Sequence, residues 1–300
     1  MNKTMSYYVG IDVGGTNIRA AILDEDYNII DKFKLENNVP MGPEFNIDKL
    51  CNEIKKKWSN YGIKAAGIGC PGPLDLKRGI IKNPPNLIGW ENFNIKQYVS
   101  QLLNIPVEVN NDANVAGYSE AKIGAGKDSK SLYYITISTG VGGGFIYDGK
   151  IINGFNNIAA EINNMIINED NYSHSGLNKG GLEGQCSGVS ISRIASDRLN
   201  INLSTEEVFN NAKLGNKECY EILDNWVLNI SKAIANIIVV VDPEVIVLGG
   251  SVILNNIEYL DRIISTVKDL VFDYVNVNIK LAEIGDDTGL IGAGILASSI

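Results

Sequence analysis

Alternating and periodic apolar positions predict that the chain starts with strands. β-Rich runs such as Tyr7–Val13 alternate with turn residues over 7–35, which indicates three strands joined by tight turns. A helix is expected next, at about 47–59, because Leu50 and Ile54 recur at helical spacing. The rest of the first half is predicted to contain a buried strand at 65–68, a helix near 95–103, a strand at 107–109 and a helix at about 113–122.

The second half of the chain begins with strands and continues mainly with helices. Leu132–Ile137 and Phe145–Tyr147 are β-rich, whereas 154–188 is polar and has few periodic positions. A loop of that length is usually functional or disordered. Beyond it, the pattern predicts helices near 190–198, 205–211 and 217–238, a buried strand at 245–248, and helices near 259–271 and 288–298.

The order of these elements predicts an α/β protein with two lobes, because strands are followed by helices in both halves. The glycine-flanked segment 124–130 marks the boundary between them. We expect a small N-terminal lobe formed by 1–122 together with 288–300, and a large C-terminal lobe formed by 123–287. Ligands of such sheets bind at the carboxyl ends of strands, so the predicted site is the cleft between the lobes.

Two glycine-rich turns, each between two β-rich runs, carry the most specific information. The first covers Gly10–Asn17 and the second covers Ile137–Gly144. Glycine lets backbone N–H groups approach an anion closely. Ordinary hairpins with glycine turns are the alternative, but each turn also contains a threonine, and Asp12 stands at the end of the first strand. The pair therefore predicts a scaffold that holds the phosphates of one nucleotide from both sides.

Composition excludes several classes of partner. The 300 residues are 45% hydrophobic and carry a net charge of −9, with a pI of about 4.8, so a polyanionic partner such as DNA is not expected. The longest apolar run, Ile237–Val241, is too short to span a bilayer, and residues 1–6 lack the apolar segment of a signal peptide. Scattered cysteines without a C-x-x-C pair indicate reduced thiols. We therefore expect a cytoplasmic protein.

Short motifs occur in a characteristic order along nearly the whole chain. They are Asp12-x-Gly14-Gly15-Thr16-x-x-Arg19, Gly67-x-Gly69-x-Pro71-Gly72, Asn111-Asp112-Ala113-Asn114, Thr139-Gly140-Val141-Gly142-Gly143-Gly144 and Leu248-Gly249-Gly250. In this order and spacing, the chain resembles the ROK family of sugar kinases. The resemblance implies the two-lobed actin/hexokinase-like (ribonuclease H-like) ATPase fold, ATP and Mg²⁺ as cofactors, a sugar as substrate, and a homodimer without nucleic-acid or membrane partners.

The resemblance also implies roles for two aspartates. Asp112 looks like the catalytic base that accepts the proton of a sugar hydroxyl, and a positioned base contributes roughly 10²- to 10⁴-fold to a rate. The same residue could instead cap the helix that starts there, because Asp is favoured at N-caps. Asp12 is expected to hold Mg²⁺, directly or through water, because this ion keeps several waters and few carboxylates.

Further binding residues follow from the same motifs. The predicted sugar ligands are Gly72, Asn86, Asn111, Asp112, Glu161, Asn164 and Glu183. The predicted nucleotide-binding residues are Asp12, Gly14, Gly15, Thr16, Asn17, Thr139, Gly140, Gly142, Gly143, Gly249 and Gly250. Carboxylates accept hydrogen bonds, and amides both donate and accept them, as the recognition of hydroxyl groups requires.

The chain departs from the family at its zinc site. The family string Glu-x-Gly-His is Glu161-Ile162-Asn163-Asn164 here, with Asn164 in place of the histidine, and Gly181 stands where the third cysteine is expected. A structural zinc needs four ligands, usually Cys or His, and His174 is the single histidine. We therefore expect no zinc. Instead, hydrogen bonds and the sugar itself should order 154–188, with Asn164 as a hydroxyl ligand.

Short local spellings favour one branch of the family. Ser138-Thr139-Gly140, Gly249-Gly250-Ser251-Val252 and Asp287-x-Gly289-Leu290-x-Gly292-Ala293 resemble bacterial N-acetylmannosamine kinases more than glucokinases. The expected reaction is therefore ATP-dependent phosphorylation of the 6-hydroxyl of N-acetylmannosamine, as in sialic acid catabolism.

A glucokinase or another hexose kinase is the alternative within the same class. A sugar-responsive repressor is not expected, because Asp12 is too near the start to leave room for a DNA-binding domain. A sugar-binding protein that has lost catalysis is disfavoured by the intact phosphate turns and by Asp112.

Overall fold

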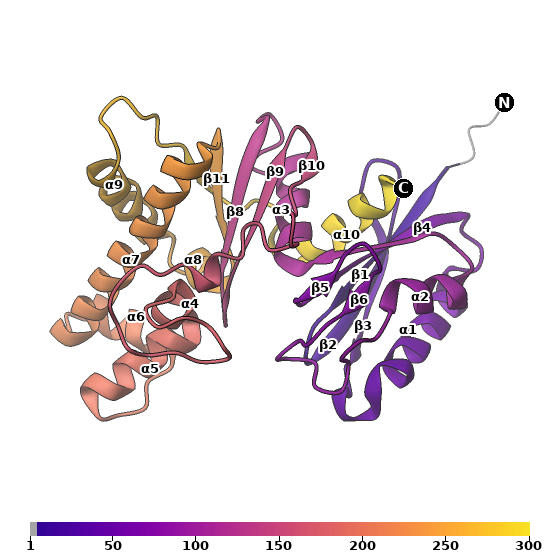
Figure 1. The fold of residues 1–300 in the computed structure, drawn as a ribbon, viewed down its shortest axis with the longest axis horizontal. Coiled ribbons are helices and arrows are strands. Elements are labelled where there is room, and N and C mark those ends of the chain that lie inside the picture. Colours follow the sequence, from indigo (N-terminus) through magenta and orange to yellow (C-terminus); the bar gives the residue numbers. More distant parts are fainter. Residues whose placement is uncertain (1–4) are drawn as a thin grey trace. The chain divides into compact units, whose positions relative to one another are not determined.

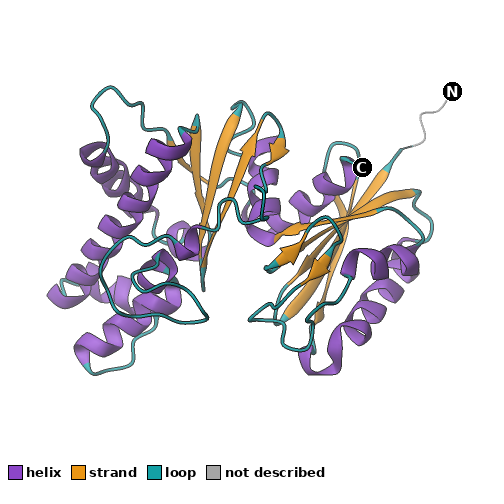
Figure 2. Ribbon diagram, in the orientation of Figure 1, coloured by secondary structure: helices purple, strands orange, loops and turns teal. Residues whose placement is uncertain are grey.

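The computed structural model describes residues 5–300, which form two compact units. Unit 1 comprises the described part of Met1–Gly124 together with Gly149–Ala159 and Ile284–Ile300, and unit 2 comprises Ala125–Asp148 and Ala160–Glu283. Residues 1–4, on which part of the signal-peptide argument rests, lie outside the described residues. The predicted α/β class is confirmed, since each unit combines a sheet with helices (Figure 2).

Unit 1 is built on a mixed sheet (Figure 1), and the order of its strands is β3-β2-β1-β4-β7. In this sheet β1 runs antiparallel to β2 and parallel to β4, and β4 runs parallel to β7. The helices and strands of unit 1 are β1 (Tyr7–Val13), β2 (Asn17–Leu23), β3 (Ile29–Glu36), α1 (Gly42–Trp58), β4 (Ile63–Cys70), β5 (Leu74–Asp75), β6 (Ile80–Ile81), α2 (Ile95–Leu103), β7 (Val107–Asn111), α3 (Asp112–Lys122), β10 (Lys150–Ile151) and α10 (Thr288–Ser298).

Helices cover this sheet on two sides. Apolar side chains of the strands form one buried cluster with those of α1 and α2, including Leu50, Ile54 and Val99. The helix α10 packs along β1 and β4, and also against α3. The helices therefore leave the carboxyl ends of β1, β4 and β7, where the predicted site residues begin, at one edge of the sheet.

The contact between α10 and the sheet is unusually close because the strands carry glycines there. A Cβ atom on Gly67 would lie 1.9 Å from the carbonyl oxygen of Ala293, and one on Gly10 would lie 2.0 Å from that of Leu290. No side chain fits at such distances, so backbone packs directly on backbone. Gly67 lies inside β4, as the strand predicted at 65–68 implies, and its missing side chain allows the helix to pack there.

Unit 2 has a second sheet, in which its strands run in the order β9-β8-β11-β12. Here β8 is antiparallel to β9 and parallel to β11. Alternate residues of β8, Tyr133, Ile135 and Ile137, join a buried cluster with the helices. The elements are β8 (Ser131–Ile137), β9 (Val141–Tyr147), α4 (Leu182–Cys186), α5 (Gly188–Leu199), α6 (Thr205–Lys213), α7 (Lys217–Val241), β11 (Val245–Gly249), α8 (Ser251–Leu254), α9 (Leu260–Leu270) and β12 (Ile279–Leu281).

The helix α7 is long and apolar enough, by length and composition, to cross a membrane. Half of its most apolar window is buried inside the protein, and residues such as Trp226 and Ile234 belong to the core of unit 2. The helix α7 is therefore a core helix of unit 2.

The structure departs from the sequence-based division in a few places. Gly149–Ala159 packs with unit 1, although the sequence placed it in the large lobe. The segment 154–188 contains a helical turn at Ile162–Asn164, a bridge between Ile166 and Gly181, and the helix α4. These pieces are too short to give a periodic pattern, which is why the segment reads as irregular.

Replacing Gly67 by Ala should destabilise unit 1 strongly, because the added methyl group forces α10 away from β4. We expect a loss of about 1–3 kcal/mol or more in the free energy of unfolding, measured by urea denaturation. Gly62→Ala is the matched control, since a Cβ there meets nothing within 4 Å. Equal stability of the two variants would contradict the packing described.

Candidate active site

The first glycine turn joins β1 to β2 and is held by its own backbone and by one asparagine. The N–H of Gly14 donates to the carbonyl of Asn17 at 2.9 Å. Asn37 holds the turn twice, because its N–H donates to the carbonyl of Thr16 at 2.9 Å and its Nδ2 donates to that of Gly14 at 2.7 Å. The turn predicted to bind phosphate is thus fixed before any ligand arrives.

Asn37 was not predicted from the sequence. Its side chain is buried, with 5% exposure. The antiparallel register pairs Asn17 with Glu36, so the residue after Glu36 must lie beside the turn. Knowing that β2 and β3 pair in this register would have identified Asn37 as the polar residue that supports the turn.

Asp12 is paired with Arg19 across the β1–β2 hairpin. Both Nε and Nη2 of Arg19 donate to the same oxygen, Oδ2 of Asp12, at 2.9 and 2.5 Å. Neither of these bonds uses Oδ1. A single partly exposed carboxylate oxygen suits Mg²⁺, which usually takes one or two carboxylates and keeps several waters. The residues present therefore fit the metal that the resemblance implies.

Asn111 and Asp112 divide two roles at the start of α3. The N-cap of this helix is Asn111, whose Oδ1 accepts from the N–H groups of Ala113 at 2.9 Å and Asn114 at 3.4 Å. Asp112 is the first helical residue, and its Oδ1 accepts from the N–H of Ala113 at 2.8 Å. The capping role considered for Asp112 therefore falls chiefly to Asn111.

The carboxyl group of Asp112 is a weaker acid than that of an ordinary aspartate. Asp112 is an exposed residue, but the protein atoms around its carboxyl group partly desolvate it. This desolvation, reinforced by the negative charge of Asp12 and partly offset by the bond from Ala113, raises the pKa of Asp112 to about 6. A carboxylate of that pKa is well suited to accept a proton near neutral pH.

Asn110 anchors the strand end that precedes Asp112. Its Oδ1 accepts from the N–H of Asn111 at 2.8 Å and from Nδ2 of Asn114 at 3.0 Å, while its own Nδ2 donates to Asn153 at 3.1 Å. Asn110 and Asn114 are each 5% exposed. This buried amide network fixes the backbone from which the side chains of Asn111 and Asp112 project.

The two remaining sugar ligands predicted in unit 1 lie in loops. Asn86 is beside the first glycine turn, because a Cβ atom on Gly15 would lie 2.9 Å from the carbonyl oxygen of Asn86. Gly72 follows β4 directly, before β5. Unit 1 thus brings Asn86 to the first glycine turn.

The second glycine turn, in unit 2, is held by the segment that carries Glu183. The N–H of Ser138 donates to the carbonyl of Gly140 at 2.9 Å, which closes the turn, and the N–H of Gly188 donates to the carbonyl of Ser138 at 2.7 Å. The N–H of Val141 donates to Oε2 of Glu183 at 2.9 Å. One donor of this turn therefore binds a side chain of the protein itself.

Two glycines, one in this turn and one in the strand that follows it, lie against the segments that carry the two predicted sugar glutamates. A Cβ atom on Gly140 would lie 2.7 Å from Oε2 of Glu183, and one on Gly143 would lie 2.6 Å from the carbonyl oxygen of Ala160, next to Glu161. The structure therefore brings both glutamate-bearing segments to one turn. Gly142 lies in β9 between these glycines.

Asn164 lies in the polar segment, two residues after the buried Ile162. Its Oδ1 accepts from the N–H of Asn178 at 2.6 Å, so its acceptor is used inside the segment. Backbone bonds from Ile167 to Gly180 and from Leu182 to Met165, both 2.9 Å, also close the segment. The hydrogen bonds expected there are thus present, and the sugar role of Asn164 stays a prediction.

The residues of this segment do not fit a structural zinc. Across residues 5–300, no three His, Cys, Asp or Glu side chains are grouped so that they could hold a metal ion. At the positions where the family resemblance implies ligands, Asn164 is bonded to Asn178, and the backbone N–H of Gly181 donates to the carbonyl of Asn178 at 3.1 Å.

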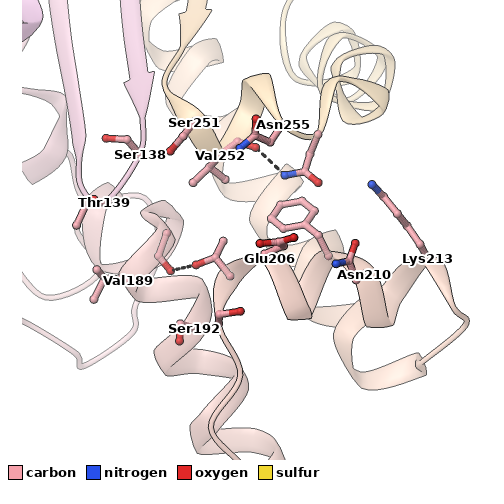
Figure 3. Close-up of a pocket in the computed structure, with 15 residues that line it drawn as sticks. Ser138, Thr139, Val189, Ser192, Glu206, Asn210, Lys213, Ser251, Val252 and Asn255 are labelled. Atoms are coloured by element: carbon pink, nitrogen blue, oxygen red, sulfur yellow. Dashed lines mark hydrogen bonds between the residues drawn. The ribbon is translucent and has the colours of Figure 1, made fainter. Parts of the chain in front are cut away.

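A pocket of about 630 Å³ opens beside the second glycine turn, within unit 2 (Figure 3). Its walls come from the end of β8, the starts of α5 and α6, and α8. It is lined by Ser138, Thr139, Gly188, Val189, Ser192, Ser204, Thr205, Glu206, Phe209, Asn210, Lys213, Ser251, Val252, Asn255 and Asn256. The volume is in the range of small-molecule sites, and hydroxyl and amide groups outnumber the apolar side chains.

Two predicted nucleotide-binding residues, Gly249 and Gly250, directly precede the pocket-lining residues Ser251 and Val252. Gly249 ends β11, and Gly250, with φ of 88°, turns the chain into α8. A Cβ atom on Gly250 would lie 2.4 Å from the carbonyl oxygen of Ile137. The loop is therefore packed against the end of β8, and it positions Ser251 and Val252 in the pocket wall.

Comparison with known proteins identifies the family. The ROK family model matches residues 8–300. A glucokinase of Halalkalibacterium halodurans is 30% identical over 316 residues, covering 97% of this chain and 94% of that protein. The crystal structure of a ROK hexokinase from Thermus thermophilus has a TM-score of 0.91 at 27% identity and covers 98% of both chains.

A second crystal structure, of a ROK family glucokinase from Streptomyces griseus in complex with glucose and AMPPNP, has a TM-score of 0.79 at 26% identity. It covers 98% of this chain and 100% of that chain. The chain therefore belongs to the ROK family, and the hexokinase-like fold predicted from the motifs is confirmed.

The acidity of Asp112 can be tested without any assay of activity. We expect its carboxyl group to titrate near pH 6 by NMR, and Asp12→Asn to lower the pKa, because it removes a negative charge that raises the pKa of Asp112. The exposed Asp26→Asn variant is the control and should change nothing. A pKa of Asp112 that does not respond to Asp12→Asn would contradict the coupling.

Proposed function

We propose that the protein is an ATP-dependent sugar kinase that phosphorylates the 6-hydroxyl of a hexose. The observation that carries the proposal is Asp112: a carboxyl group with a pKa of about 6 whose capping role is taken by Asn111, on the same sheet edge as the first glycine turn. The named relatives support it, since they are glucokinases and a hexokinase, one of them with glucose and AMPPNP bound.

In the proposed reaction Asp112 acts as the general base. It accepts the proton of the 6-hydroxyl while that oxygen attacks the γ-phosphorus of ATP. The bond between this phosphorus and the bridging oxygen breaks, and ADP leaves with the electron pair. Asn110 and Asn111 hold the base in place through the start of α3. The products are ADP and the sugar 6-phosphate.

For the nucleotide, we propose that the pocket of unit 2 takes the base and ribose, and that the two glycine turns take the phosphates. The hydroxyl and amide groups of the pocket suit a nucleoside, and Thr139 belongs both to its wall and to the second turn. Asp12 would hold Mg²⁺, which neutralises phosphate charge when bound.

For the sugar, we propose that Asn86, Asn111 and Glu183 bind its hydroxyl groups, together with Gly72, Glu161 and Asn164. Glu183 is the best-placed of these in unit 2, because its two oxygens are fixed by protein donors and each retains a lone pair for a hydroxyl.

Glucose is our first candidate substrate. The spellings that favoured N-acetylmannosamine lie elsewhere than at the predicted sugar ligands: Ser138 and Ser251 line the proposed nucleoside pocket, and a Cβ on Gly289 would lie 3.5 Å from Cγ of Asp12. They therefore carry little information on the sugar. The glucokinase relatives favour glucose, and N-acetylmannosamine remains the second candidate through the resemblance alone.

The proposal includes a cytoplasmic location and a homodimer. All four cysteines are free and buried, which agrees with a reducing compartment that supplies ATP. The homodimer rests on the family resemblance, and light scattering coupled to size-exclusion chromatography measures it directly.

Asp112→Asn should keep the fold and sugar binding but lower kcat at least about 10²-fold, since an amide cannot accept the proton. In the wild-type protein kcat/KM should fall as the pH is lowered through about 6, where Asp112 becomes protonated. The residual activity of Asp112→Asn should lack this step. Asp26→Asn serves as the control. Near-normal turnover of Asp112→Asn would assign the residue a structural role.

A panel of sugars decides the substrate. ADP release is measured by a coupled assay with glucose, mannose, fructose, N-acetylglucosamine and N-acetylmannosamine side by side. We expect glucose to give the highest kcat/KM. A clear preference for N-acetylmannosamine would restore the second candidate, and sugar binding without ADP release would make the protein a binding module.

A further inference from the structure

The carboxylate of Glu183 is gripped from two sides within unit 2. Oε2 accepts from the N–H of Val141 at 2.9 Å, and Oε1 lies 3.0 Å from Nε2 of His174. An ionised carboxylate can only accept hydrogen bonds, so Nε2 of His174 must carry the donated proton. Both oxygens of Glu183 are therefore fixed by partners that the sequence analysis did not assign to this residue.

His174 is itself held by a stack of side chains. Its ring lies 5.4 Å from the ring of Tyr172 at an interplanar angle of 29°, and the guanidinium carbon of Arg193 lies 3.5 Å from the centre of the same Tyr172 ring. Nη2 of Arg193 donates to the carbonyl of Gly184 at 3.0 Å, next to Glu183. The stack thus runs from α5 to the imidazole and back to α4.

The hydrogen bonding around His174 favours a proton on Nε2. Its Nδ1 is buried and has no hydrogen-bond partner. With the proton on Nε2, the unpaired atom is an acceptor lone pair. A protonated Nδ1 would instead bury a donor without a partner, which is costly. A proton on Nε2 therefore suits the contacts of both ring nitrogens, and this proton is the one that holds Glu183.

We propose that His174 is a positioning residue for Glu183 and, through it, for the sugar. The inference rests on the proposed function in so far as Glu183 binds sugar. A glutamate loses side-chain rotamer freedom when it is immobilised, and a carboxylate that is already fixed spares the sugar that entropic cost. Each oxygen keeps a second lone pair for a hydroxyl group.

The same stack accounts for the order of a segment whose residues do not fit zinc. Tyr172 and His174 lie in the middle of 154–188, and Arg193 ties them to α5. Protein side chains therefore connect the polar segment to the helices of unit 2. The positioning of Glu183 follows from these contacts alone.

The test compares three replacements of His174 in the full chain. His174→Ala removes the donor, His174→Gln places an amide nitrogen where Nε2 was, and His174→Asn places one only as far as Nδ1. We expect Ala and Asn to raise KM for the sugar about tenfold, with kcat and KM for ATP within about twofold of wild type. His174→Gln should bring KM for the sugar most of the way back to the wild-type value.

Ser173→Ala, at an exposed neighbouring position, is the matched control and should behave as wild type, and thermal melts of all variants report on folding. An unchanged sugar KM in His174→Ala overturns the inference and leaves the proposed function intact. So do equal effects of Gln and Asn, which would indicate a role in packing alone. A wild-type protein that phosphorylates no sugar of the panel overturns the proposed function, and this inference with it.

Discussion

Both units depend on contacts made where a side chain is missing. In unit 1, Gly10 and Gly67 let the backbone of α10 rest on the central strands. In unit 2, Gly140 leaves space for the carboxylate of Glu183 against the second turn. A Cβ atom would overlap the group that packs at each of these positions, so each position is restricted to glycine. The same contact fixes where the packed group lies. The geometry of the strand ends follows from this packing.

Much of the fold could be predicted because the long elements have clear apolar periods. The ranges of β1, α2 and α10 agree with the structure, whereas α1 begins at Gly42. Its first turn contains Pro43 and Glu44, which suit a helix start but add nothing to the apolar pattern. Short elements such as α8 and β12 were missed, because three or four residues cannot display a period.

The candidate site was predicted less evenly. Motifs identified residues whose own chemistry is distinctive, such as Asp12 and Asp112, but not the residues that hold them. Asn37 supports the first turn only because of the β2–β3 register, and His174 reaches Glu183 only because 172–184 folds back on itself. Such partners are set by tertiary contacts, and a single sequence read without pairing information offers no signal for them.

The separation of Asn111 from Asp112 has a consequence for the stability of α3. A helix capped by a carboxylate loses part of its cap whenever that group takes up a proton. In this protein a neutral amide supplies the cap, and the adjacent carboxyl group changes its charge. Protonation and deprotonation of Asp112 therefore leave the cap at this end of α3 intact.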